Sequence, residues 1–223
     1  MHKLPLIIVI LTLAGAMASP AAAEDRFFLR IGAGASDVSL KNLDAELQLQ
    51  GNAKVAAGYS FAVSLGRTFA EDYWSLEAHF AAMFFPGFDY TCPSDSFPGK
   101  MRHFSYALVL QRHFRPEGKY FKPTLGAGIG YGVTNLISGG GKLNAPEALI
   151  TGRVESSITS TIDLSLECTY YAGLQTKQFS SPHLENYEGD AVYDSAGNIL
   201  SDRYRSLDLR LGIRVWLRQM GPQ

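Results

Sequence analysis

The sequence has few charges and few cysteines. Charged residues make up 18% of the 223 residues and the net charge is −1, against a usual charged fraction of about 25%. A net charge so close to zero gives no indication of a nucleic-acid partner, and none is expected. The two cysteines could pair in an oxidising compartment or remain separate thiols, because Cys92 falls in a polar segment and Cys168 within a predicted strand.

The first residues carry the features of a secretory signal peptide. A short basic start precedes the apolar run Leu4–Leu13, and Ala21–Ala23 is a small-residue cleavage site, with residues 16–18 as a second candidate. The apolar run is shorter than the about 20 residues that a membrane-spanning helix needs. The sequence therefore predicts a cleaved signal peptide at residues 1–23 and a single domain at residues 24–223.

The mature chain contains many segments in which every second residue is apolar. In the stretch SLDLRLGIRVWL, residues 206–217, the odd positions are all apolar, whereas most residues between them are charged. Such alternation is typical of a strand with two unlike faces, because successive side chains of a strand point to opposite sides. Each segment covers roughly 9 to 13 residues, the length that a tilted strand needs to cross a bilayer. The eight segments are 27–36, 54–66, 73–84, 103–114, 124–133, 147–157, 162–174 and 206–217.

The connections between these segments alternate in length. Long polar segments follow the first, third, fifth and seventh predicted strands, and short ones follow the second, fourth and sixth. Long and short connections then lie at opposite ends of an antiparallel sheet, as is typical of outer-membrane barrels. No helical segment is predicted to interrupt the series. The long segments are 37–52, 86–102, 134–146 and 176–204.

The two faces of the predicted strands differ in a way that favours a membrane barrel over a soluble one. A soluble barrel turns bulky apolar residues inward and covers its outside with hydrated side chains. Here Gly, Ser and Ala dominate the polar face and its charges are of both signs, which suits a narrow lumen in which opposite charges neutralise each other. The sequence predicts an all-β, eight-stranded antiparallel up-and-down transmembrane β-barrel, with a soluble barrel as the alternative. The residues expected to form a charge network in the lumen are Arg30, Glu77, His79, Arg153, Glu155, Asp163, Glu167, Asp208, Arg210 and Arg214.

The chain resembles the small eight-stranded outer-membrane barrels of the OmpA-like and porin-like "outer membrane protein beta-barrel" family. The resemblance rests on the glycine-alternating strand FKPTLGAGIGYGV, the hairpin from GYSF to WSLEAHF, and the final strand. Family members end in a strand that the barrel assembly machinery recognises, and this chain then continues through RQMGPQ. The positions that match this assembly signal are Arg210, Gly212, Val215 and Leu217. The resemblance implies a monomer without cofactors in a Gram-negative outer membrane, with the assembly machinery, membrane lipid and lipopolysaccharide as partners.

The interior of an eight-stranded barrel is filled by side chains, so an open channel is not expected. The leading hypothesis is a structural or surface-interaction protein, not an enzyme, whose four long extracellular loops contact lipopolysaccharide, an external surface or another envelope protein. A small-solute channel is one alternative.

The other alternative is an enzyme that modifies lipid A, a deacylase or an acyltransferase. His103 and Ser105 stand at i and i+2, on one face of a strand, as a base beside a nucleophile requires. Their parity points them into the lumen, where an acyl chain in the membrane does not reach them. A metal site is not expected at His79, because no second His or Cys accompanies it at the spacing of metal ligands.

Overall fold

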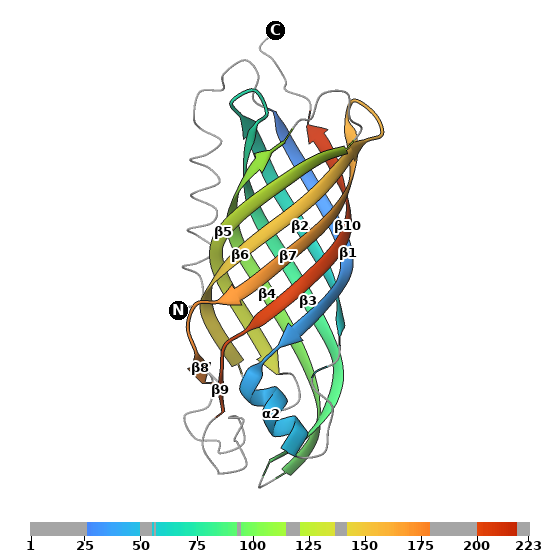
Figure 1. Ribbon diagram of the computed structural model, residues 1–223. Coiled ribbons are helices and arrows are strands. Elements are labelled where there is room, and N and C mark those ends of the chain that lie inside the picture. Colours follow the sequence, from blue (N-terminus) through green and yellow to red (C-terminus); the bar gives the residue numbers. More distant parts are fainter. Residues whose placement is uncertain are drawn as a thin grey trace.

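The computed structural model is a closed barrel of eight antiparallel strands (Figure 1). It describes residues 26–49, 55, 57–92, 95–114, 121–136, 142–178 and 200–217, so the predicted signal peptide lies outside the described residues. The strands are β1 (Phe27–Ser39), β2 (Gly58–Phe69), β3 (Trp74–Cys92), β4 (Asp95–His113), β5 (Phe121–Leu136), β6 (Lys142–Ser157), β7 (Ile162–Gly173) and β10 (Arg205–Leu217). Each strand pairs with the next one along the chain, and β10 closes the barrel against β1. The predicted fold class is confirmed.

The alternation of the sequence determines which side of each strand faces the lumen. In β10, Leu211 is 71% exposed on the outer wall, whereas Arg210 beside it is 2% exposed. The same alternation of buried and more exposed residues runs through β1, β2, β6 and β7, and most of the outward-facing side chains in the middle of these strands are apolar. This is the arrangement of a membrane barrel and the reverse of a soluble one.

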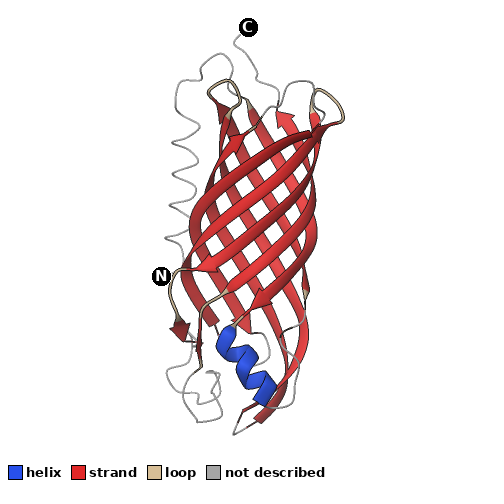
Figure 2. Ribbon diagram, viewed as in Figure 1, coloured by secondary structure: helices blue, strands red, loops and turns tan. Residues whose placement is uncertain are grey.

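The connections β2–β3, β4–β5 and β6–β7 lie at one end of the barrel, the turn end, and the connections β1–β2, β3–β4, β5–β6 and β7–β10 lie at the other, the loop end (Figure 2). The turn between β2 and β3 has three consecutive residues with positive φ, from Ala70 to Asp72. The side chains of Thr68 and Arg26 both donate to the carboxylate of Asp72. These bonds hold a backbone conformation that L-residues rarely adopt.

The loop end corrects three expectations. The first predicted loop contains a helix, α2 (Lys41–Leu49), although no helix was expected. The second predicted loop is mostly strand, because β3 and β4 continue as a paired hairpin to Cys92 and Asp95. A register shift between Phe85 and Phe88 accommodates the proline and glycine that favoured a loop. The third predicted loop, residues 134–146, is mostly strand, because β5 runs to Leu136 and β6 begins at Lys142. The fourth connection contains two short paired strands, β8 (Lys177–Gln178) and β9 (Ser201–Asp202).

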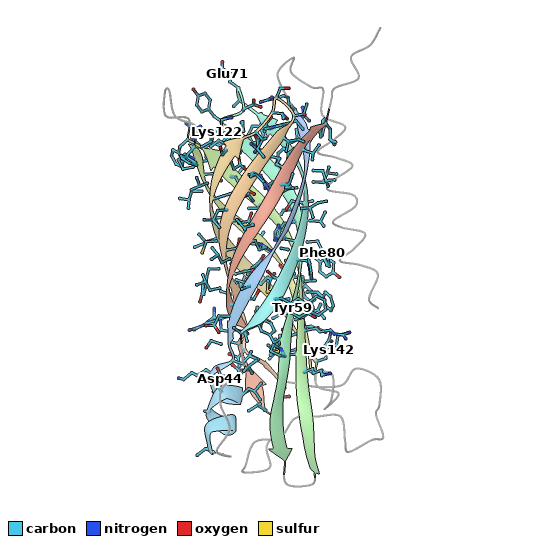
Figure 3. The ribbon with its side chains drawn as sticks, turned by 90° about the vertical axis from the view of Figure 1, so that its right-hand side faces the viewer. Asp44, Tyr59, Glu71, Phe80, Lys122 and Lys142 are labelled. Atoms are coloured by element: carbon cyan, nitrogen blue, oxygen red, sulfur yellow. The ribbon has the colours of Figure 1, made fainter. Side chains whose placement is uncertain are left out.

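The outer wall carries an apolar band between two charged rims. On β4 the outward-facing residues from Phe104 to Leu110 are uncharged, with Arg102 at the loop end and Arg112 at the turn end. Ten residues of a strand tilted by about 40° rise about 26 Å, which matches the about 25 Å apolar band of outer-membrane barrels. Tyr59 and Phe80 project from this wall in Figure 3.

Within the described residues, no helix has the length and apolar character needed to cross a membrane.

Candidate functional site

The ten residues expected in the lumen all lie inside the barrel, and none is more than 7% exposed. We call them the luminal charge network. They come from five strands: Arg30 from β1, Glu77 and His79 from β3, Arg153 and Glu155 from β6, Asp163 and Glu167 from β7, and Asp208, Arg210 and Arg214 from β10.

Arg30 joins the two sides of the lumen. Its Nη1 lies 2.6 Å from Glu77 Oε2 on β3, and its Nη2 lies 2.8 Å from Glu155 Oε1 on β6. Strands β3 and β6 are not neighbours in the barrel wall. The arginine therefore crosses the interior rather than following its surface.

Arg153 and Arg210 share the carboxylate of Glu167. Arg153 Nε donates to Glu167 Oε2 at 2.7 Å, and Arg210 Nη2 donates to Glu167 Oε1 at 2.5 Å. Arg153 Nη1 also donates to Gln111 at 2.6 Å and to Glu77 at 3.3 Å. The two arginines thus connect β3, β4, β6, β7 and β10 around one point of the lumen.

Further contacts extend the network towards both ends of the barrel. Arg214 Nη2 lies 2.7 Å from Asp163 Oδ2 and 2.7 Å from Glu155 Oε2, but it hydrogen-bonds only to the aspartate. Arg210 Nη1 lies 3.1 Å from Asp208 Oδ2 without the alignment of a hydrogen bond, so this contact is electrostatic. Asp208 Oδ1 accepts hydrogen bonds from two serine hydroxyls, those of Ser36 and Ser60.

All five carboxylates of the network contact at least one of its four arginines. Each buried negative charge of the network therefore lies beside a positive one, as buried charges require. A void of about 10 Å³ remains between Arg30, His79 and Arg210, which is room for about one water molecule. The middle of the lumen is filled.

A cluster of buried apolar side chains, the apolar cap, lies at the loop end of the barrel. Leu40, which precedes α2, and Leu43 in its first turn are fully buried, and Val55, Leu200 and Tyr204 are buried in the same cluster. The helix is held in place from another loop, because Asp202 Oδ2 accepts the backbone N–H groups of Asn42 and Leu43, each at 2.9 Å. Burial raises the pKa of Asp202, although these N–H groups favour its charged form.

Residues 8–214 match the family model described as the outer membrane protein beta-barrel domain. The chain belongs to this family. The chain is therefore a protein of the bacterial outer membrane, and it forms the eight-stranded barrel that the sequence predicts. No curated protein matches the sequence.

The solved structures that are similar to the chain include three barrels. Neisserial surface protein A, NspA, superposes with a TM-score of 0.56 at 17% identity, over 85% of this chain and 96% of that one. The N-terminal barrel domain of OprF from Pseudomonas aeruginosa gives a TM-score of 0.43 at 14% identity, over 85% and 97%. Ail, the attachment invasion locus protein of Yersinia pestis, gives 0.42 at 14%, over 86% and 99%. At these identities the likeness to NspA shows the fold alone.

The pair His103 and Ser105 lies in the lumen of this family member, near the loop end. The hydroxyl of Ser105 donates a hydrogen bond to Glu147 Oε1. His103 Nε2 lies 3.2 Å from Glu147 Oε2, the other oxygen of the same carboxylate. His103 Nδ1 lies 2.9 Å from Thr134 Oγ1, and its ring stacks on Tyr204 at 3.6 Å. The serine is bonded to a carboxylate rather than to the histidine, so the histidine is not placed as its base.

Glu147 is a buried luminal residue outside the ten that the sequence predicts. Its parity is that of Arg153 and Glu155 on the same strand, and this signal identifies it as inward-facing. Gln111 is a second addition, because its side chain bonds to Arg153.

His79 is connected to the arginines of the network through Tyr171. Its Nε2 lies 2.9 Å from the hydroxyl of Tyr171, which accepts a hydrogen bond from Arg210, and its Nδ1 lies 2.8 Å from Ser64 Oγ. In the described parts of the chain, no group of three or more His, Cys, Asp or Glu side chains is arranged to hold a metal ion. Cys168 is a free thiol on the outer wall.

A cavity of about 590 Å³ opens at the turn end of the barrel. Arg26, Lys122 and Arg214 contribute positive charge to its lining, and Asp72, Glu155 and Asp163 contribute negative charge. The cavity ends where the luminal charge network begins, because Glu155, Asp163 and Arg214 belong to both.

The predicted assembly signal lies on β10, which closes the barrel. Arg210 faces the lumen, whereas Val215 and Leu217 face the outer wall. Gly212 pairs with Gly32 of β1, and a Cβ atom there would lie 2.9 Å from Ser165 Oγ. The close approach of β1, β7 and β10 leaves little room for a larger residue at this position.

Proposed function

We propose that this protein is a structural and surface-interaction protein, in which a filled barrel anchors a folded extracellular end that binds a ligand outside the cell. In outer-membrane barrels the longer connections face the outside, so the loop end is taken as the extracellular end. The observation that carries the proposal is the contact between loops at this end. Asp202 of the fourth connection holds the first turn of α2 in the first connection.

The filled lumen supports this role over transport. Four arginines and five carboxylates occupy its middle, and the apolar cap lies at the loop end. A solute entering from the cavity at the turn end would have to separate Arg214 from Asp163 and Glu155. Separating buried ion pairs is costly.

The hairpin of β3 and β4 provides a second structured element for binding. Its backbone pairing continues past Phe85 and Met101 to Cys92 and Asp95, beyond the point at which the other strands end (Figure 1). An extended, paired hairpin loses little conformational entropy when it binds, compared with an unstructured loop. We also propose that the chain is a monomer, and that Arg210, Gly212, Val215 and Leu217 are the residues through which the assembly machinery recognises β10.

Attachment of cells that display the protein tests the proposal. In the variant, residues 86–100 are replaced by Asn-Gly, which joins the paired residues Phe85 and Met101 by a two-residue turn. The control is Glu71→Ala, an exposed change in the turn at the opposite end. Attachment is counted on surfaces coated with heparin, laminin or collagen.

We expect wild-type cells and the control to attach to at least one of these surfaces, and the shortened variant to lose about tenfold or more in attachment. Protein levels are matched by the gel shift of the folded barrel. Equal attachment by the variant, or no attachment above that of cells lacking the protein, would contradict the proposal.

A further inference from the structure

Two cationic side chains lie on the outer wall of the barrel at the loop end. Arg102 of β4 and Lys142 of β6 both pair in register with Asn135 of β5, so the three residues lie on one line across the wall. Neighbouring strands are about 4.8 Å apart, which places the two cationic residues about 10 Å apart. Their sequence neighbours Met101, His103, Thr134 and Leu143 are buried, so all three side chains of the line project outward.

The line lies at the depth of lipid headgroups. Arg102 marks one limit of the uncharged band on β4 and Arg112 marks the other, about 26 Å away along the barrel axis. Each guanidinium lies over an aromatic ring at the edge of the band, Arg102 over Phe84 at 5.8 Å and Arg112 over Trp74 at 5.1 Å. Arg102 and Arg112 therefore lie at equivalent depths in opposite leaflets.

An aromatic surface lies directly below the line, on the side of the membrane interior. Phe104 is two residues below Arg102, and its ring centroid lies 6.3 Å from that of Phe84 and 6.4 Å from that of Phe80. Tyr106 and Tyr131 pair across β4 and β5 one step further down. Figure 3 shows Tyr59 and Phe80 on the outer wall, with Lys142 closer to the loop end. Such a surface offers acyl chains a broad apolar contact.

The charged side chains described on this part of the outer wall are all positive. Among the side chains that the structure describes on the outer wall of β2 to β6 at the loop end, the charged ones are Lys100, Arg102 and Lys142, and there is no carboxylate. A cationic rim above an apolar wall is complementary to an acylated lipid with an anionic headgroup.

We propose that Arg102, Asn135 and Lys142 bind a phosphate of lipid A, the phosphorylated and acylated disaccharide of the outer leaflet, while its acyl chains lie along the aromatic surface. The guanidinium of Arg102 matches two phosphate oxygens at once, Lys142 supplies a second charge, and the amide of Asn135 donates between them. This lipid site goes beyond the surface-interaction role. It rests on the proposed function only in taking the loop end as the extracellular end.

Native mass spectrometry of the refolded protein in detergent tests this site. Wild-type protein is titrated with bisphosphorylated lipid A, with its monophosphorylated form and with phosphatidylglycerol. The test variant is Arg102→Gln with Lys142→Gln, which removes both charges and keeps polar side chains. Arg112→Gln controls for a cation in the opposite leaflet, and Arg205→Gln controls for an exposed cation at the same end on β10.

We expect bisphosphorylated lipid A to bind wild-type protein more tightly than phosphatidylglycerol, and the double variant to lose about tenfold or more in affinity. The two controls should keep the affinity of the wild type. Equal binding by the double variant, or equal binding of phosphatidylglycerol, overturns the proposal. The measurement depends neither on cell attachment nor on membrane orientation, so its failure is distinguishable from failure of the proposed function.

Discussion

Arg210 of β10 lies directly opposite Glu167 of β7, and its Nη2 donates to Glu167 Oε1 at 2.5 Å. The same carboxylate accepts from Arg153, which lies opposite Glu167 on the other neighbouring strand, β6. One buried acid therefore joins three consecutive strands of the barrel wall. Removing one partner of such a group leaves an uncompensated charge in a place that water does not reach.

Arg210→Leu should lower the free energy of unfolding by about 3 to 5 kcal/mol, because Glu167 and Asp208 lose a buried partner. The measurement is urea unfolding in lipid vesicles, with the folded form recognised by its faster migration in unheated gels. Arg205→Leu, on the same strand but exposed, should change the free energy by no more than about 0.5 kcal/mol. Equal stability of the two variants would show that the luminal charge network does not stabilise the barrel.

The filled lumen predicts that the purified protein conducts little or no current. Planar-bilayer recordings of wild-type protein should show no steady steps, because Arg30, Arg153 and Arg214 each bridge carboxylates in the middle of the lumen. An open porin reconstituted in the same lipid serves as the control. Large steady currents from the wild-type protein would favour the channel alternative.

The sequence predicted the faces of the strands better than the contacts within the lumen. Alternation alone assigns Arg210 inward and Leu211 outward, because the side-chain period of a strand is two. The partner of Arg30 on β6 could not be predicted in the same way. It depends on which residues of two non-adjacent strands reach the same depth, and strand register sets that depth.

The loop end was harder to predict, because its elements depend on a register shift and on a long-range contact. Pro86 and Gly87 are typical of a loop, yet a register shift lets β3 continue past them. The helix α2 is stabilised by Asp202, which lies about 160 residues away along the chain. A contact of that range leaves no periodic signal in the helix itself.

Asp202→Ala should loosen α2 without unfolding the barrel. The change removes the acceptor for the N–H groups of Asn42 and Leu43, and loss of such a cap costs about 1 kcal/mol. Hydrogen exchange at these two amides should become about fivefold faster. Ser201→Ala is the control, because Ser201 contacts Asn42 through its backbone carbonyl, which the change leaves in place. Equal exchange in both variants would mean that Asp202 does not hold the helix.

Gly130 of β5 should not tolerate a side chain. A Cβ atom at this position would lie 2.2 Å from the carbonyl oxygen of Tyr106 and 2.7 Å from the Cβ of Ala107 on β4. Gly130→Ala should therefore destabilise the barrel by about 1 to 3 kcal/mol, the usual cost of overpacking. Gly152→Ala on the next strand is the matched change, since a Cβ atom there meets nothing within 4 Å. Urea unfolding in vesicles compares the two, and equal stability would contradict the close approach of β4 and β5.

The depth of the outer wall in lipid can be measured with two leucines of β10. Leu211 is at the middle of the strand and 71% exposed, whereas Leu217 is its last residue, at the turn end. If the wall faces hydrocarbon, Leu211→Arg should cost about 2 to 4 kcal/mol and Leu217→Arg about 0 to 1, because the cost of a charge falls from the bilayer centre to its edge. Both free energies come from urea unfolding in vesicles of one lipid. In vesicles with a thinner hydrocarbon layer the penalty at Leu211 should shrink, since the charge then lies nearer to water. A penalty independent of position and of bilayer thickness would mean that the wall does not sense membrane depth, and the outward face of β10 would then have to be covered by protein instead.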